Sequence, residues 1–406
     1  MSTLSTRHRL PLMAITAVAL AVALVLTGAP AGAAPPEGTI LHAGGATSIA
    51  NRYIVVLKDS EVSRADVEVM AERLAAKFGG SVGFVYEDAL RGFEIQVSQR
   101  AAARIAALPQ VDYVEQVHTV QLVATQLNPP SWGLDRIDQR NLPLNNSYTY
   151  PNTASGVNVY IIDTGIRLTH NDFGGRAFTG FDAITSGGTA NDCHGHGTHV
   201  AGTVGGTAHG VAKQVRLYAV RVLNCSGSGT TAQVVAGVNW VTANAVRPAV
   251  ANMSLGGGAN TSIDNAVRNS INAGITYAVA AGNGNALGIR QNACNYSPAR
   301  VSTAITVGAT QSNDQAASFS NYGTCVDILA PGVNIVSAWY SSNTATRSLS
   351  GTSMATPHVA AAAALVLQAH PTWSPAQVKS HLESTATTGV ITNPGSGTPN
   401  RLLYVS

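Results

Sequence analysis

The sequence predicts an α/β protein with a mostly parallel central sheet, preceded by a small α+β domain. Four continuous apolar runs have the length of strands, and helical patterns lie between them (157–162, 215–222, 249–255 and 275–280). Strands that are buried on both faces and joined by helices form parallel sheets. Charge density supports the division, because residues 52–123 carry 18 charged side chains and the much longer stretch 124–406 carries only 24.

Composition excludes several classes of protein. The chain has 406 residues with 40 glycines, and only 11% of its residues are charged. Disordered chains combine low hydrophobicity with high charge, and coiled coils need abundant Glu and Lys at regular spacing, so neither fits. A net charge of +3, spread over the chain, does not favour nucleic acid as a partner.

The N-terminus has the pattern of a secretory signal peptide. Basic residues at 7–9 precede an apolar run at 12–26, and small residues follow at 29–34. We expect residues 1–34 to be removed on export and the protein to be extracellular. The alternative is a membrane anchor, but a run of about 15 residues is too short to span a bilayer comfortably.

The small domain is predicted to have a ferredoxin-like order of elements. Ser63 is placed as an N-cap before a helix whose apolar positions include Val67, Met70, Leu74 and Phe78. The other expected elements are strands 52–57, 82–86, 93–97 and 111–120 and a helix at 99–107. This order is ferredoxin-like, and residues 121–130 fit an exposed linker. An unrelated accessory domain is equally compatible with this stretch.

The helices expected in the large domain lie at 196–204, 231–245 and 262–273. A further run at 360–367 is almost entirely Ala and Leu, which predicts a buried central helix rather than a membrane span.

Three short segments of the large domain could carry chemistry. Asp163 lies in Asp-Thr-Gly at the end of a predicted parallel strand, the edge of an open sheet where sites form. His196 lies in a histidine-rich turn that opens a helix, and Ser353 lies in Gly-Thr-Ser before the buried helix. Taken singly, the first is compatible with a turn and the last with a helix cap. Together they supply an acid, a base and a nucleophile.

Two other interpretations of these segments are weaker. Aspartic proteases need two Asp-Thr-Gly or Asp-Ser-Gly segments, and the sequence has one. A metal cluster of His194, His196 and His199 lacks an H-E-x-x-H motif or a cysteine pair beside it.

Four cysteines lie in the second half of the chain. An exported protein can oxidise them, and four cysteines allow three pairings. A zinc site would show tight C-x-x-C pairs, which are absent, so two disulfides are expected.

The order Asp163, His196, Ser353 resembles that of the subtilisin-like serine proteases, or subtilases. Within that family the chain is most similar to the proteinase K group and especially to aqualysin. The similarity covers residues 124–406, with an early marker at 132–139, and residues 52–123 resemble the family's inhibitor-type propeptide. The resemblance implies the family's three-layer α/β fold, and it implies that the precursor is an inactive zymogen.

The resemblance also assigns roles. Ser353 would attack the scissile carbonyl, His196 would act as base and then acid, and Asp163 would orient the imidazole. The side-chain amide of Asn283 and the backbone N–H of Ser353 would hold the oxyanion. The alternative for Asn283 is a turn residue.

Protein and peptide substrates are expected to bind as an added β-strand between two segments. The wall of the first pocket would be small and uncharged, giving broad specificity with an apolar or aromatic residue before the cut. The predicted substrate-binding residues are Ser226, Gly227, Ser254, Leu255, Gly256, Ala280 and Gly282.

The resemblance further implies the pairs Cys193–Cys225 and Cys294–Cys325. It implies structural calcium at two places. One is the cluster Asp135, Asp138, Gln139 and Asn145, and the other is Asp327 with backbone carbonyls near Ser302. The alternative is that these acids cap loops or pair with arginine. The loop 184–190 lacks the aspartates that relatives use for a further calcium site.

The predicted function is thus a secreted, monomeric serine endopeptidase without an organic cofactor or membrane anchor. Its propeptide would act as an intramolecular chaperone and inhibitor and be cut off near Ala124 by the enzyme itself. The alternative is a catalytically silent binding or inhibitor protein that keeps the fold.

Overall fold

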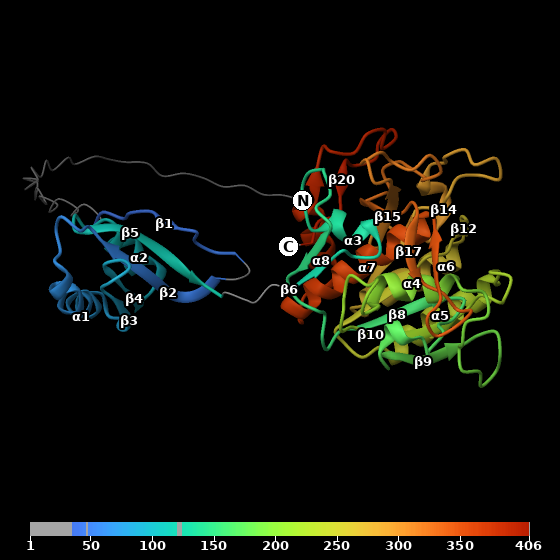
Figure 1. Ribbon diagram of the computed structural model, residues 1–406, viewed down its shortest axis with the longest axis horizontal. Helices are drawn as coiled ribbons and strands as arrows, with labels where there is room; N and C mark the ends of the chain where they lie inside the picture. The colour runs from blue at the N-terminus through green and yellow to red at the C-terminus, as the bar shows by residue number, and fades with distance from the viewer. Residues whose placement is uncertain (1–34, 46–47, 120–123, 406) are drawn as a thin grey trace, which may run out of the picture. The chain divides into compact units, whose positions relative to one another are not determined.

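The computed structural model describes residues 35–45, 48–119 and 124–405, which fall into two compact units divided after Val120 (Figure 1). The predicted signal peptide lies outside the described residues. No helix within the described ranges has the length and apolar character needed to cross a membrane.

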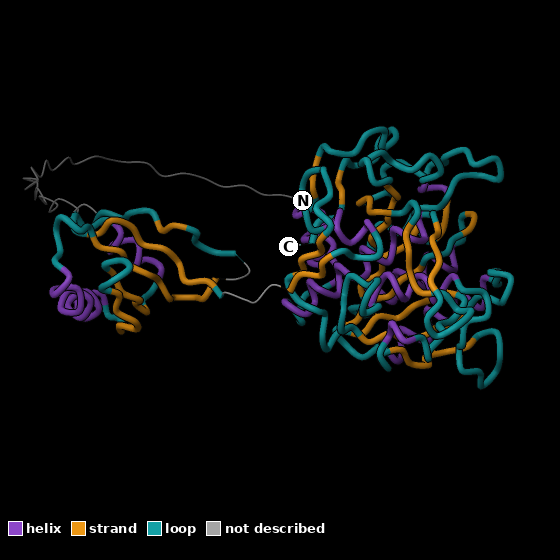
Figure 2. Tube along the Cα trace, in the orientation of Figure 1, coloured by secondary structure: helices purple, strands orange, loops and turns teal. Residues whose placement is uncertain are grey.

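The small unit is one antiparallel sheet with two helices packed on one face (Figure 2). Its elements are β1 (Ile40–Leu41), β2 (Ser48–Leu57), α1 (Val67–Phe78), β3 (Ser81–Tyr86), β4 (Gly92–Gln96), α2 (Gln99–Ala106) and β5 (Val111–His118). The strand order is β1-β5-β2-β4-β3, which is ferredoxin-like with one short parallel strand added. Alternate residues of β2 and β4 are buried under the helices, because side chains of a strand point to opposite faces.

One predicted cap of the small unit differs from the structure. Ser63 precedes a 3₁₀ turn, Arg64–Asp66, and α1 begins only at Val67. The Ser63 hydroxyl donates to the Asp66 carboxylate instead of accepting from a helix N–H.

The large unit contains a nine-stranded sheet in which every neighbouring pair except β19–β20, at one edge, is parallel. The order is β19-β20-β16-β15-β13-β11-β8-β10-β9. These strands are β8 (Asn158–Asp163), β9 (Ala177–Asp182), β10 (Arg216–Arg221), β11 (Ala249–Met253), β13 (Thr276–Ala280), β15 (Ile305–Thr310), β16 (Ile328–Pro331), β19 (Thr387–Thr388) and β20 (Arg401–Leu402). The mostly parallel central sheet of an α/β protein, expected from the sequence, is confirmed.

Helices cover both faces of this sheet. They are α3 (Trp132–Ile137), α4 (His196–Gly205), α5 (Thr231–Asn244), α6 (Thr261–Asn272), α7 (Thr352–Ala369) and α8 (Pro375–Thr385). Three small antiparallel pairs complete the unit: β6 (Ala124–Leu127) with β7 (Ser147–Tyr150), β12 (Gly257–Gly258) with β14 (Tyr296–Ser297), and β17 (Ile335–Ala338) with β18 (Thr346–Leu349).

The two faces of the central strands belong to different cores, which gives three layers. Val159 and Ile161 of β8 pack with α4, α7 and α8, whereas Tyr160 and Ile162 pack with α5 and α6. The predicted buried helix is α7, and its alanine run lets the helix lie close to the strands because alanine adds little bulk.

Candidate active site

Asp163 is the last residue of β8 and is completely buried. The backbone N–H of Thr164 donates to its Oδ1 at 2.7 Å. Its strand lies between β10 and β11, where the order of the sheet reverses direction. In open α/β sheets such a switch point at the carboxyl ends of the strands is where sites form.

His196 is the first residue of α4, and its ring contacts Asp163. The imidazole Nδ1 lies 2.7 Å from Asp163 Oδ1 and 2.9 Å from Oδ2. Gly195 has φ of 109°, and a Cβ there would lie 2.5 Å from the Trp339 ring. Glycine is therefore required at this turn both for its backbone conformation and for space.

Burial and the aspartate act in opposite directions on the histidine. Burial alone would lower the pKa of His196, but the Asp163 carboxylate more than offsets it and raises the pKa above its usual value. The bond to Asp163 also fixes the neutral tautomer, with the proton on Nδ1 and a free acceptor at Nε2.

Asp192 holds the turn between the aspartate strand and the histidine helix. Its Oδ1 accepts from the Thr164 hydroxyl and from the N–H groups of His194 and Gly195, each at 2.9 Å. Its Oδ2 accepts from the N–H and hydroxyl of Thr198. One buried carboxylate thus links β8 to α4, and charge-assisted bonds of this kind are the stronger ones.

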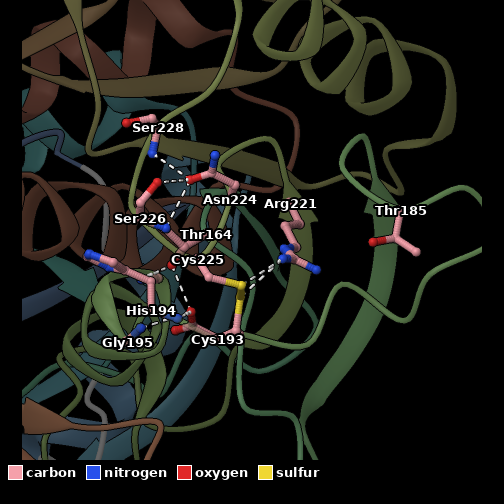
Figure 3. The surroundings of a disulfide bond; sticks show 12 residues. Thr164, Thr185, Cys193, His194, Gly195, Arg221, Asn224, Cys225, Ser226 and Ser228 are labelled. Atoms are coloured by element: carbon pink, nitrogen blue, oxygen red, sulfur yellow. Dashed lines mark hydrogen bonds between the residues drawn. A yellow bond between two sulfur atoms is a disulfide. The ribbon is translucent and has the colours of Figure 1, made fainter.

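A disulfide ties the same turn to the segment 224–228, as Figure 3 shows. Cys193 is bonded to Cys225, and the Arg221 guanidinium lies beside both sulfurs. Asn224 Oδ1 accepts from Ser226 and Ser228, which shapes this segment. The second disulfide joins Cys294 and Cys325, so both pairs are those that the resemblance implies.

Ser353 is the second residue of α7, and both its hydroxyl and its carbonyl oxygen form hydrogen bonds with Ser254. Its hydroxyl donates to the Ser254 carbonyl oxygen at 3.1 Å rather than to the imidazole. Pro357, four residues later, has no N–H for the Ser353 carbonyl oxygen. The Ser254 hydroxyl donates to that oxygen at 2.8 Å, so two reciprocal bonds join Ser254 and Ser353.

Asn283 follows β13, and Thr352 fixes its orientation. The N–H and hydroxyl of Thr352 both donate to Asn283 Oδ1 at 2.8 Å. The side-chain Nδ2 is therefore directed away from Thr352. A Cβ built on Gly351 would lie 3.3 Å from this Nδ2 and 3.6 Å from the Ser353 backbone nitrogen, so the two nitrogens lie close to the same point.

Two clefts meet at His196. The first, of about 590 Å³, is lined by His196 together with predicted substrate-binding residues: Ser226, Gly227, Ser254, Leu255 and Gly256. The second, of about 370 Å³, contains His196, Asn283, Ser353, Trp339 and Arg347. Ala280 and Gly282 lie at the end of β13 and are not among the described residues that line either cleft.

The arrangement places an oriented base, a hydroxyl and two neighbouring N–H groups, those of Asn283 Nδ2 and the Ser353 backbone, at one cleft. Such a set can activate a hydroxyl nucleophile and stabilise an oxyanion that forms next to it. The sequence alone did not single out Asp192, His194, Thr352 or Trp339 for this site. Asp192 and Thr352 could have been suspected only from being polar residues adjacent to the catalytic segments.

In the first predicted calcium cluster, most of the side chains form hydrogen bonds with backbone groups. Asp135 accepts from the N–H groups of Asn145 and Asn146, and Asn145 Oδ1 accepts from Ser147. Gln139 donates to two backbone carbonyls. Asp138 differs, because its Oδ1 is buried without a hydrogen-bond partner. Burial raises the pKa of Asp138 to about 6, and the Asp135 carboxylate adds to the effect.

The second predicted calcium site departs from the expectation. Lys379 Nζ lies 2.8 Å from Asp327 Oδ2 and donates to the carbonyl oxygens of Ser302 and Ala304 at 2.9 and 2.7 Å. The resemblance assigned Asp327 and backbone carbonyls near Ser302 to the metal, and the lysine contacts that carboxylate and two carbonyls of this segment. Among the described residues, no group of three or more His, Cys, Asp or Glu side chains could hold a metal ion.

Comparison with known proteins places these features among proteases. The model of the subtilase family matches residues 154–402. An extracellular serine proteinase of Thermus sp. (strain Rt41A) is 52% identical over 92% of this chain and 94% of its own length. Alkaline serine exoprotease A of Vibrio alginolyticus is 46% identical over 90% of this chain and 69% of its own length.

A solved structure gives the same result for the fold. The crystal structure of a cold-adapted subtilisin-like serine proteinase matches with a TM-score of 0.64 and 52% identity, covering 68% of this chain and 98% of that chain.

Proposed function

The chain belongs to the subtilase family of serine proteases, and we propose that it is a secreted endopeptidase made as a self-processing precursor. The observation that carries the proposal is the Asp163–His196 bond at the rim of a cleft that also contains Ser353 and Asn283. Together these residues supply the nucleophile, the base, the orienting carboxylate and the amide donor that acyl transfer requires.

In this mechanism the Ser353 hydroxyl leaves the Ser254 carbonyl when substrate binds and transfers its proton to His196 Nε2. Ser353 Oγ then attacks the scissile carbonyl, and the oxyanion receives hydrogen bonds from Asn283 Nδ2 and the Ser353 N–H. His196 gives the proton to the leaving amine, while Asp163 stabilises the imidazolium. Water repeats the sequence to release the acyl group.

We propose that substrate lies along the 590 Å³ cleft as an added strand between segments 226–228 and 254–256. Apart from two histidines, the residues that line this cleft are uncharged. Main-chain recognition tolerates many sequences, and an uncharged cleft favours apolar or aromatic side chains, so broad specificity with an apolar or aromatic residue before the cut follows.

The small unit is proposed to be the propeptide, with cleavage near Ala124. It has its own hydrophobic core, separate from the cores of the large unit, so it can act as a folding aid that is later removed. The Thermus relative, named as an extracellular serine proteinase, supports export of this chain.

A pair of experiments tests the catalytic proposal. A serine-directed sulfonyl fluoride should label Ser353 in the mature protein and abolish peptide hydrolysis. Ser353→Ala should accumulate as uncut precursor, with Ser350→Ala as the matched control that is processed normally. Normal processing of Ser353→Ala, or labelled enzyme that stays active, would disprove the mechanism.

We also propose that calcium binds at Asp138 with Asp135, Gln139 and Asn145. The unpartnered buried Oδ1 of Asp138 and its repulsion by Asp135 are features that a hard cation would relieve. Chelation should lower the melting temperature of the parent protein, and Asp138→Asn should abolish that response. An unchanged response in Asp138→Asn would refute this site.

A further inference from the structure

Lys379 makes a three-point contact between α8 and the amino-terminal ends of two neighbouring strands. Ala304 immediately precedes β15, and Asp327 immediately precedes β16. The lysine comes from α8, more than 50 residues further along the chain. Its side chain is 17% exposed and that of Asp327 is 18% exposed, so the contact is largely shielded from water.

The geometry uses the whole bonding capacity of the ammonium group. A lysine ammonium has three N–H donors and no acceptor. Its three oxygen neighbours, Ser302 O, Ala304 O and Asp327 Oδ2, lie at 2.9, 2.7 and 2.8 Å. The Thr306 N–H also donates to Asp327 Oδ2, which holds the carboxylate in place.

The same oxygens form the kind of set that binds calcium. A carboxylate and two backbone carbonyls are hard donors, and calcium takes six to eight such oxygens with water completing the shell. Glu383 lies 3.9 Å from the ammonium group, so a second carboxylate is one helical turn away. A cavity of about 750 Å³, lined in part by Ser302, Lys379 and Glu383, leads to the position.

We propose that the Lys379 ammonium group replaces a divalent cation at this position, and that the Asp327 site is closed to calcium for as long as the lysine is present. The positive charge that joins β15, β16 and α8 is thus part of the polypeptide. The stability of this region does not depend on metal, and calcium dependence in this protein comes from elsewhere in the chain.

Substitution of the lysine should turn the position into a calcium site. In Lys379→Ala the oxygens of Ser302, Ala304 and Asp327 lose their common partner and water can enter from the cavity. Equilibrium dialysis of protein inhibited with a sulfonyl fluoride should find one more calcium per chain in Lys379→Ala than in the parent. At a calcium concentration about 100 times its Kd, the variant should melt roughly 5–10 °C higher than in EDTA from this site alone.

Two control variants separate metal binding from loss of packing. Lys379→Met removes the charge but keeps an apolar stem in the position, so it should be less stable and gain no calcium. The double variant Lys379→Ala/Asp327→Asn should also lose the additional calcium. Each result is a difference in bound calcium between a variant and the parent. A calcium ion at Asp138 would be counted in both proteins, so the test holds whether or not the proposed Asp138 site exists.

A further experiment uses the parent protein with Lys379 in place, so its result does not depend on whether the lysine variants fold. Asp327→Asn in the parent should leave the number of bound calcium ions unchanged. Loss of one calcium ion in that variant would overturn the proposal, and so would a correctly folded Lys379→Ala that binds no more calcium than the parent.

Discussion

Ser254 and Pro357 should be energetically coupled through the carbonyl oxygen of Ser353. Pro357 removes the N–H that would donate to this oxygen in a regular helix, and the Ser254 hydroxyl donates in its place at 2.8 Å. Ser254→Ala removes that donor. It also leaves Asn252 Nδ2 without the Ser254 hydroxyl, to which it donates at 2.9 Å.

The size of the effect follows from these two lost bonds. An unsatisfied buried polar group costs about 1–3 kcal/mol, so the two groups that Ser254→Ala leaves unpaired should lower the free energy of unfolding by roughly 2–6 kcal/mol. Pro357→Ala returns an N–H to the helix at the position that faces Ser353 O. In the double variant the Ser353 carbonyl oxygen has a donor again. The double variant should therefore be about 1 kcal/mol more stable than the sum of the two single substitutions predicts.

The assay is a double-mutant cycle on the inhibited enzyme. Urea unfolding of the parent, both single variants and the double variant gives the coupling directly. Pro375 is the matched control, because it is the first residue of α8, where a backbone N–H has no helical acceptor. Ser254→Ala combined with Pro375→Ala should therefore be additive. If Ser254→Ala and Pro357→Ala are also additive, to within about 0.5 kcal/mol, the explanation of the Ser254 contact is refuted.

Three further predictions concern catalysis and pH. Asn283→Leu should lower kcat by about 10²–10³ with little change in KM, since it removes an oxyanion donor; a change in KM alone would contradict the role. Asp163 raises the pKa of His196, so kcat/KM of the parent should fall on the acid side at a pH above 6.5. Asp163→Asn should lower kcat by about 10⁴ and shift this acid limb to lower pH. An acid limb that does not shift in the variant would count against the pairing. Burial lowers the pKa values of His199 and His358 to about 4, so the unfolded state takes up more protons between pH 6.5 and 4. The free energy of unfolding should fall by about 3 kcal/mol per histidine over that range, and His358→Asn should flatten the dependence in urea titrations; an equally steep dependence would refute this assignment.

Local patterns predicted much of the fold because the relevant signals lie close together in the sequence. The apolar run 157–162 predicted a strand that the structure places at Asn158–Asp163, and the alanine run predicted the buried helix α7. A parallel sheet brings the carboxyl ends of its strands to one edge, so the end of an apolar run placed Asp163 where sites form. Only its combination with the segments of His196 and Ser353 favoured a site over a turn.

Contacts between distant segments could not be predicted in this way. Arg136 is fully buried and pairs with Asp314, 178 residues away, and nothing in the residue types of either segment marks the two as partners. Lys379 was missed for the same reason, since two of its three partners are backbone carbonyls that leave no mark in the residue types. The side chains that orient a site, such as Thr352 on Asn283, also depend on geometry that only the folded chain supplies.

The two edges of the central sheet have different roles, and this separation makes the Lys379 proposal testable without disturbing catalysis. Asp163 ends β8, and Asn283 follows β13, so these two groups of the proposed mechanism lie at the carboxyl edge. Ala304 and Asp327 precede β15 and β16, so the Lys379 contact lies at the opposite, amino edge. Parallel strands keep these edges apart by their own length. Substitution of Lys379 should therefore change stability and calcium binding while kcat, measured well below the melting temperature, stays within about twofold of the parent. Asn283→Leu should instead lower kcat and leave the number of bound calcium ions unchanged.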